Sequence, residues 1–105
     1  MFPGGMNMGR LMKQAQDIQR KMEKVQEDLK ARVVDATAGG AVTARVNGQQ
    51  ELLDLQIRPE VLKEDPEMLR DLVVTAVNEA LKKSKALKEQ ELGKVSGGLG
   101  GLAGM

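Results

Sequence analysis

Residues 33–58, VVDATAGGAVTARVNGQQELLDLQIR, decide the fold of this chain. Apolar and polar side chains alternate in three successive runs, and a period of two is typical of strands that bury one face. The apolar members are Val34, Ala36 and Ala38, then Val42, Ala44 and Val46, then Leu53, Leu55 and Ile57. Gly39-Gly40 and Asn47-Gly48 separate the runs, and such pairs are typical of tight hairpin turns. The stretch therefore predicts a three-stranded antiparallel sheet.

The register of this sheet follows from keeping all apolar side chains on one face. A three-residue first turn, Gly39 to Ala41, and a four-residue second loop, Gly48 to Glu51, satisfy that condition. The second loop would pair Asn47 with Leu52, and we expect Gly48 to adopt a positive φ there. The same register places Arg45 between Asp35 and Asp54 on the exposed face. We interpret this trio as a structural pairing of charges.

A long helix is predicted from Met8 onward. Its apolar residues recur in alternating steps of three and four, a heptad seam typical of a helix that contacts another helix: Met8, Leu11, Ala15, Ile18, Met22, Val25 and Leu29. A helix lying on a sheet usually shows a wider apolar stripe. Two interpretations stay open, a helix that projects from the body and an ordinary amphipathic helix packed on its own sheet.

The opposite face of this helix is mainly basic. It carries Arg10, Lys13, Asp17, Arg20, Lys24 and Glu27, with Lys21 beside them. Most charged helix faces are only solvated, but a stripe of cations also fits contact with phosphates. Both interpretations stay open at this point.

A second helix is predicted after the sheet. Arg58-Pro59 ends the third strand, residues 59–64 suit a single helical turn, and Asp65-Pro66 is a helix start with Asp65 as cap. The helix has a wide apolar stripe suited to packing on the sheet: Leu69, Leu72, Val73, Ala76, Val77, Ala80 and Leu81. Four lysines follow, either as helix-dipole partners or as further phosphate contacts: Lys82, Lys83, Lys85 and Lys88. From Gly93 we expect a flexible Gly-rich tail, so residues 1–92 form one α-β-β-β-α domain and residues 93–105 the tail.

Composition excludes several functions. The 105 residues contain no cysteine and no histidine, so no disulfide, zinc site or histidine-activated nucleophile is expected. We expect no enzyme activity, no cofactor and no small-molecule substrate. No apolar run approaches the ~20 residues of a membrane span, and Met1-Phe2-Pro3 is too short for a signal peptide, so a cytoplasmic protein is expected. Residues 51–79 carry a net charge of −5, whereas the segments on either side are positive.

Short motifs along almost the whole chain resemble the bacterial YbaB/EbfC family of nucleoid-associated DNA-binding proteins. They are Met12-Lys13-Gln14-Ala15-Gln16, Gly39-Gly40, Val46-Asn47-Gly48, Ile57-Arg58-Pro59, Asp71-Leu72, Val77-Asn78-Glu79-Ala80 and Ser96-Gly97-Gly98. The resemblance implies a tweezer-like homodimer that binds DNA and alters its conformation in the nucleoid. It carries over no individual DNA-contacting residue, and Gln49-Gln50 stand where the family often has a basic residue.

We therefore expect an α+β homodimer that binds double-stranded DNA with little sequence specificity, without membrane contact. The candidate DNA-binding residues, chosen by charge, are Arg10, Lys13, Arg20, Lys21, Lys24, Lys82, Lys83, Lys85 and Lys88. The candidate dimer or helix seam is Leu11, Ala15, Ile18, Met22, Val25 and Leu29. The alternative is a non-catalytic protein-interaction module whose heptad helix docks a partner.

Overall fold

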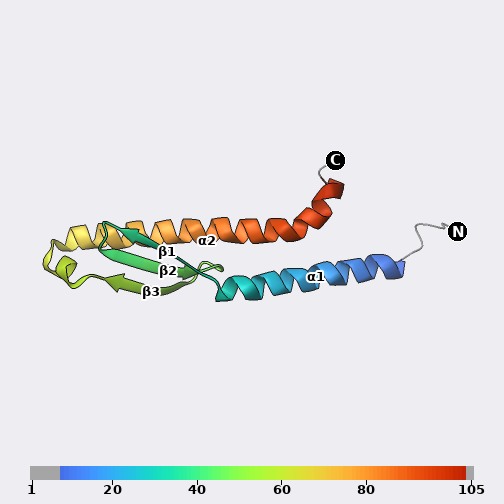
Figure 1. The fold of residues 1–105 in the computed structure, drawn as a ribbon, viewed down its shortest axis with the longest axis horizontal. Helices are drawn as coiled ribbons and strands as arrows, with labels where there is room; N and C mark the ends of the chain where they lie inside the picture. Colours follow the sequence, from blue (N-terminus) through green and yellow to red (C-terminus); the bar gives the residue numbers. More distant parts are fainter. Residues whose placement is uncertain (1–7, 104–105) are drawn as a thin grey trace.

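The computed structural model describes residues 8–103, with side chains as far as residue 95, and has the α+β architecture that the sequence predicts. The elements in order are α1 (Met8–Ala31), β1 (Val33–Ala38), β2 (Val42–Asn47), β3 (Leu52–Ile57), the 3-10 helix η1 (Pro59–Lys63) and α2 (Pro66–Ala103). The strands form one antiparallel sheet in the order β1-β2-β3. Both helices extend beyond the sheet on the same side of it, and Figure 1 shows them running alongside each other in opposite chain directions.

The core lies between α2 and the face of the sheet formed by β1 and β2. It is built mainly from small side chains: Ala36, Ala38, Val42, Ala44, Val46, Ala76 and Ala80. Alanines on both layers let the helix approach the strands closely, as dense packing requires. All seven apolar residues predicted to face the sheet from α2 pack in or against this cluster, so that prediction is confirmed.

The pairing of β1 with β2 is the predicted one. Ala38 pairs with Val42 across the turn, and Asp35 pairs with Arg45. Gly39 and Gly40 have φ angles of 57° and 63°, which glycine adopts without strain. Arg45 also pairs with Asp54, but no ion pair within 4.0 Å joins this arginine to either carboxylate, both of which lie in the described part of the chain. The trio is thus aligned by register without being bonded.

The predicted pairing of β2 with β3 is wrong beyond Arg45. Val46 pairs with Leu52 rather than with Leu53, because a bulge interrupts the ladder at this point. The loop closes one residue earlier than expected, through a hydrogen bond of 3.0 Å from Asn47 N to Glu51 O, and Leu53 is left as the extra residue between the pairs Val46–Leu52 and Arg45–Asp54. Leu52 and Leu53 are consequently 49% and 53% exposed, although Leu53 was expected on the buried face.

The expectation of a positive φ at Gly48 is also wrong. The positive φ in this loop belongs to Gln50, at 64°, and among the described glycines only Gly39 and Gly40 share it. Gly48 is required for a different reason: a Cβ atom there would lie 2.6 Å from the carbonyl oxygen of Leu29. The glycine thus permits a close approach of the loop to the end of α1.

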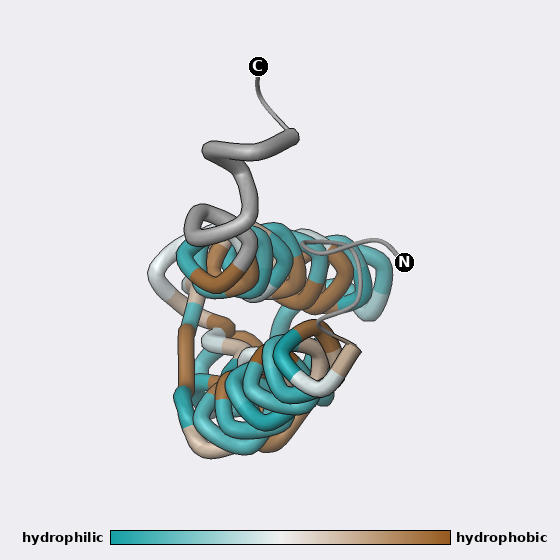
Figure 2. Tube along the Cα trace, turned by 90° about the vertical axis from the view of Figure 1, so that its right-hand side faces the viewer, coloured by the Kyte–Doolittle hydropathy of each residue, from teal (hydrophilic) through white to brown (hydrophobic). Residues whose placement is uncertain are grey.

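Of the two interpretations of the first helix, the projecting one holds. Leu29 is the one residue of α1 that is buried, and the helix lies beside the far half of α2 rather than on the sheet. Figure 2 looks along both helices from their far ends and shows hydrophobic turns on the sides that face each other. The part of each helix beyond the sheet is called an arm below, residues 8–31 of α1 and residues 82–103 of α2, and residues 32–81 are called the head.

Helix α2 does not end where the tail was expected. It continues through Gly93 to Ala103, and Figure 1 shows it bending in its last turns. Glycine lowers helix stability by about 1 kcal/mol per residue relative to alanine. A flexible tail at residues 93–105, and with it the division of the chain at residue 92, therefore stays a prediction.

The close contact at Gly48 leads to a first prediction. Gly48→Ala should lower the stability of the protein by roughly 1–3 kcal/mol, because the added methyl group overpacks against the Leu29 carbonyl. Gln50→Gly should not destabilise, since it removes the cost of a left-handed conformation. Thermal unfolding followed by circular dichroism measures both.

The matched control is Gly9→Ala, at a helical glycine where an added Cβ would meet no atom within 4 Å. It should leave the melting temperature unchanged or slightly raised. Equal melting temperatures for Gly48→Ala and Gly9→Ala would show that the approach to Leu29 is looser than described.

Candidate nucleic-acid interface

The loop from Asn47 to Glu51 positions both arms relative to the head. The backbone N–H of Gly48 donates to the carbonyl of Leu29 at 2.8 Å and to that of Arg32 at 3.0 Å, which holds the end of α1. On the other side, the buried Ser84 hydroxyl of α2 donates to Asn47 O at 2.6 Å and accepts from Gln50 N at 3.2 Å. One loop therefore bonds to both helices at the point where they leave the sheet.

A charged contact joins the α2 arm to Arg32, the residue that follows α1, just beyond this loop. Glu91 of α2 accepts hydrogen bonds at Oε1 from Arg32 at 3.0 Å and from Lys94 at 3.1 Å. The hydrogen bond and charge of Lys94, followed by the hydrogen bond and charge of Arg32, lower the pKa of the Glu91 carboxyl below its ordinary value. The Glu91 side chain is only 20% exposed, and its ion pair with Arg32 links the α2 arm to the end of α1.

The basic residues predicted on α1 are all solvent-exposed: Arg10, Lys13, Arg20, Lys21 and Lys24. Arg20 pairs with Asp17 at 3.6 Å, but the side chains are 71% and 48% exposed, so the pair is weak and a phosphate can compete for the arginine. Lys21 and Lys24 line a groove of about 330 Å³ between the arms, together with Val25, Val95 and the charged residues Asp28, Glu91 and Lys94. The structure thus places cations along the whole length of the α1 arm.

The lysines predicted on α2 differ among themselves. Lys83 donates from Nζ to the backbone carbonyl of Asp35 at 2.8 Å, at the outer edge of β1. Lys82 pairs with Glu79 at 3.7 Å, Lys85 is exposed, and Lys88 is half-buried. Lys83 thus also has a structural role, as a hydrogen-bond donor to the backbone of β1. The structure does not gather these four lysines with the cations of α1 into one cluster.

The predicted seam of α1 is covered progressively toward the head. Leu29 is fully buried and Ile18, Met22 and Val25 are half-buried, whereas Ala15 and Leu11 are exposed. The far half of α2 supplies the cover near the head, with Leu87, Leu92 and Val95 half-buried. Within the described residues, α2 therefore covers the part of the seam near the head, whereas Leu11 and Ala15 are exposed.

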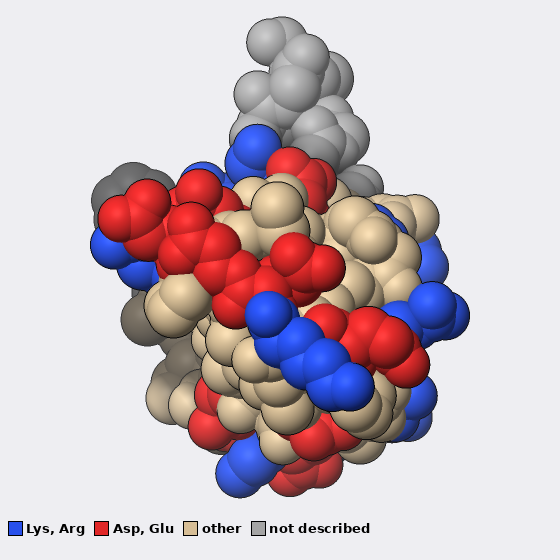
Figure 3. All heavy atoms as spheres, turned by 90° about the vertical axis from the view of Figure 1, so that its left-hand side faces the viewer, with Lys and Arg blue, Asp and Glu red and all other residues tan. Residues whose placement is uncertain are grey.

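The end of the molecule opposite the arms is acidic. Figure 3 looks onto this end, formed by η1 and the start of α2, and shows many acidic side chains across it with a smaller number of basic ones among them. The exposed acidic residues of this region are Glu60, Glu64, Asp65, Glu67 and Asp71. The molecule thus has an uneven distribution of charge, positive along the arms and negative at the opposite end.

Sequence reasoning missed the residues that hold the arms together. Sequence patterns singled out none of Arg32, Ser84, Glu91 and Lys94. A signal did exist for the second half of α2: Leu81, Ser84, Lys88, Glu91 and Val95 follow helical spacing and continue the buried side of the helix. Polar residues at these positions concealed the pattern.

No helix in the described part of the chain is long and apolar enough to cross a membrane. Within the same residues, no group of three or more acidic side chains could hold a metal ion. The arrangement offers cations on an exposed helix, which suits contact with an extended polyanion.

Comparison with known proteins points the same way. A model of the YbaB/EbfC DNA-binding family matches residues 4–99. A nucleoid-associated protein of Acetivibrio thermocellus is 50% identical over 99% of this chain and 95% of its own length. A nucleoid-associated protein of Ruminiclostridium cellulolyticum is 48% identical over the same shares. The fold resembles the crystal structure of an uncharacterized protein from Helicobacter pylori, with a TM-score of 0.73, 26% identity and coverage of 81% of this chain and 91% of that one.

The Glu91 contact leads to a second prediction. Because the pKa of Glu91 is lowered in the folded protein, its ionised form stabilises the fold above the ordinary pKa of 4.5, and this contribution is lost as the pH falls below that value. Glu91→Gln should lower the melting temperature at pH 7 and have a smaller effect at pH 3. Glu89→Gln, at an exposed position two residues earlier in α2, is the control and should have little effect at either pH. An equal loss for Glu91→Gln at both pH values would exclude a charge-dependent link.

Proposed function

This chain belongs to the YbaB/EbfC DNA-binding family, and from that premise we propose that it is a nucleoid-associated protein that binds duplex DNA through its basic arms. Binding has little sequence specificity and alters the conformation of the DNA, with effects on nucleoid organisation and gene expression. The relatives named above support the nucleoid role, and their similarity spans nearly the full length of the chain.

The observation that carries this proposal is the line of cations along α1. Arg10, Lys13, Arg20 and Lys24 are exposed and follow steps of three, seven and four residues, so they lie on one side of the helix. They extend over roughly 21 Å of helix, about six base pairs of duplex. A line of cations without aromatic rings or a recognition motif fits contact with the phosphate backbone, which is independent of sequence.

The interaction-module alternative has less support. The seam that would dock a partner helix is covered near the head by α2 of the same chain. Together with the family match, this favours DNA as the ligand of the arms.

The working unit in this proposal is a homodimer. The radius of gyration is 21.0 Å, whereas a compact chain of about 100 residues has roughly 13 Å, so little of the chain is buried. Strand β3 is an edge of the sheet and carries Leu53, which is 53% exposed, and Val74 of α2 is 51% exposed. Lys83 covers the opposite edge at β1, which favours β3 as the side that meets a second copy.

A third prediction tests the cations of α1. The quadruple variant Arg10→Gln, Lys13→Gln, Arg20→Gln, Lys24→Gln should bind duplex DNA more weakly at every sequence. The slope of log affinity against log salt should become shallower by ~0.9 for each phosphate that the variant no longer binds. Fluorescence anisotropy with two unrelated duplexes at several salt concentrations measures both quantities.

The head offers a control with the same change of charge, Arg45→Gln, Arg58→Gln, Lys63→Gln, Arg70→Gln, at four exposed positions. The control should keep a salt slope close to that of the unmodified protein. If both quadruple variants lose affinity equally, net charge rather than the arm decides binding, and the proposal fails.

A fourth prediction concerns the dimer. Sedimentation equilibrium at micromolar concentration should give twice the mass of 11.4 kDa. Leu53→Glu together with Val74→Glu should shift the equilibrium to the monomer, because both side chains are exposed in the single chain and would become buried charges in the interface. A folded monomer as the main species of the unmodified protein would contradict the dimer.

A further inference from the structure

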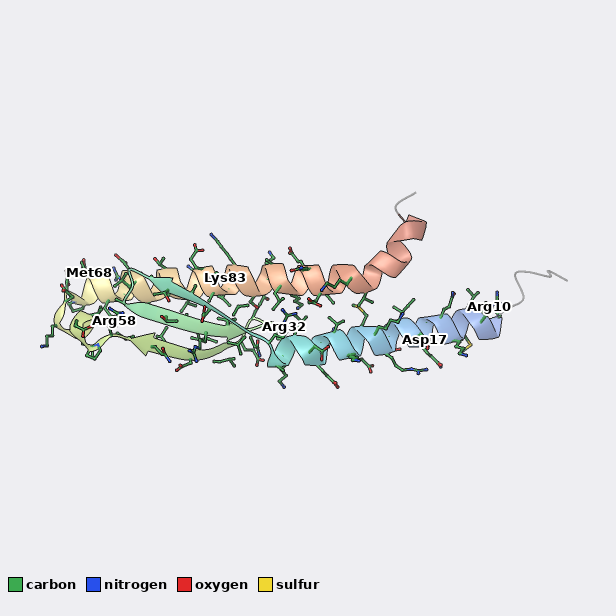
Figure 4. The ribbon with its side chains drawn as sticks, in the orientation of Figure 1. Arg10, Asp17, Arg32, Arg58, Met68 and Lys83 are labelled. Carbon is green, nitrogen blue, oxygen red and sulfur yellow. The ribbon has the colours of Figure 1, made fainter. Side chains whose placement is uncertain are left out.

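The groove between the arms gathers cations from both helices around one carboxylate. Its charged lining consists of Lys21, Lys24, Asp28, Glu91 and Lys94, and it is called the inner groove below. Arg32 reaches the same place through its bond to Glu91, and Figure 4 shows Arg32 where α1 ends, between the two helices in this view. Arg32 and Lys94 both donate to one oxygen, Oε1 of Glu91, at 3.0 and 3.1 Å. A phosphate oxygen of DNA accepts the same kind of bonds from converging cations.

The inner groove adjoins the line of cations on α1. Lys21 and Lys24 are exposed and differ by about 60° around the helix axis, and Lys24 is itself a member of that line. Among the described residues, no ion pair within 4.0 Å involves either lysine. Arg32 and Lys94, whose side chains are 53% and 64% exposed, would extend the basic surface to the head. Because Glu91 offsets the charge of these two cations, the basic surface ends before the head.

Another ion pair in the arms shows how Glu91 differs from an ordinary surface carboxylate. The Asp17 side chain lies 3.6 Å from Arg20 and is 48% exposed, so solvent and salt screen that pair. Glu91 is 20% exposed and accepts shorter, charge-assisted hydrogen bonds from two cations, so a phosphate gains less by replacing it. The hydrogen bond of Lys94, followed by the contributions of Arg32, also lowers the pKa of Glu91, and the carboxylate is therefore charged at neutral pH.

We propose that this contact is autoinhibitory: the Glu91 carboxylate takes the place of a DNA phosphate at Arg32 and Lys94 and confines the duplex to the outer part of the arms. The inference rests on the proposed DNA-binding function and concerns the regulation of that same surface. While Glu91 is charged, the two cations nearest the head contribute little to binding. Removal of this charge makes both cations available to phosphates and extends the DNA contact toward the head.

The first experiment measures the affinity of full-length Glu91→Gln for duplex DNA by fluorescence anisotropy at several salt concentrations. The variant should bind more tightly than the unmodified protein, and the slope of log affinity against log salt should become steeper by ~0.9 for each cation that gains a phosphate. Glu89→Gln is the matched control, because it makes the same change of charge at an exposed position about 200° around α2 from Glu91. It should leave the salt slope unchanged.

Asp28→Asn is a second control, within the inner groove itself. The Asp28 carboxylate lines the groove but forms no ion pair within 4.0 Å among the described residues. Its replacement removes a negative charge without releasing a cation, so the affinity should rise only slightly and the salt slope should stay the same. If Asp28→Asn steepens the slope as much as Glu91→Gln does, the overall charge of the groove limits binding and the inference is overturned.

A double-mutant cycle tests whether Glu91 acts through the cations bonded to it. In the presence of Glu91, Arg32→Gln and Lys94→Gln should each leave the salt slope nearly unchanged. In the Glu91→Gln background, each should make the slope shallower by ~0.9. Lys24→Gln is the reference, because it should lose the same ~0.9 in both backgrounds. A purely structural role of Glu91 would give no such coupling, and additive effects of the substitutions would therefore overturn the inference.

Circular dichroism at the temperature of the binding experiments checks that each variant is folded, since Glu91→Gln is expected to lower the melting temperature. If that variant is unfolded there, the single variants that retain Glu91 decide. Equal losses of salt slope in Arg32→Gln and Lys24→Gln would show that Arg32 already binds phosphate, which overturns the inference. A loss confined to Lys24→Gln supports it.

The outcomes separate this inference from the proposed function. If neither the unmodified protein nor Glu91→Gln binds the duplex, the proposed function fails and the inference fails with it. If the unmodified protein binds and Glu91→Gln has the same affinity and salt slope as Glu89→Gln, the inference alone fails, and Glu91 is only a structural link between α2 and the end of α1. Tighter binding with a steeper slope for Glu91→Gln, but not for Glu89→Gln, supports both.

Discussion

The arrangement of this molecule depends on the approach of Gly48 to the end of α1. The backbone N–H of Gly48 lies 2.8 Å from the Leu29 carbonyl, and a side chain at this position has no room. The surrounding loop is fitted to that contact. The Asn47 side chain, 2% exposed, accepts from the backbone of Gln49 and Glu51, and Gln50 takes a left-handed conformation. Local strain at Gln50 is the cost of placing the loop where it can satisfy the end of a helix.

This junction matters because the arms have little else to fix their direction. A compact head buries its core under α2, but α1 between Met8 and Met22 has a largely exposed surface. An isolated helix of this length is only marginally stable in water. The bonds from the loop to Leu29, Arg32 and Ser84, and the Glu91 contact beyond them, therefore decide how far apart the arms lie. The same contacts therefore contribute to the stability of the head and fix the positions of the arms.

The sequence alone predicts the helices and strands of this fold, but it does not predict the contacts between them. Strand alternation, paired glycines and the wide stripe of α2 are local patterns, and each predicted its element correctly. The bulge at Leu53 and the role of Gly48 depend on contacts between segments distant in sequence, Gly48 with Leu29 and Asn47 with Ser84, which no local pattern contains. The cations of α1 were found by charge and spacing alone, but the structure shows that Lys83 also serves the edge of β1, a partner outside its own helix.

The separation of charge along the molecule has a physical consequence for any encounter with DNA. The molecule extends over 77 Å in its longest direction, whereas charges in physiological salt are screened over about 8 Å. The acidic end and the basic arms are therefore too far apart for their charges to cancel, and each interacts with a nearby polyanion separately. In the proposed mode of binding, DNA would repel the carboxylates near Asp65 and attract the arms, so the protein would approach the duplex with its arms first. A net charge of only +1 thus conceals an uneven distribution of charge, basic in the arms and acidic at the far end.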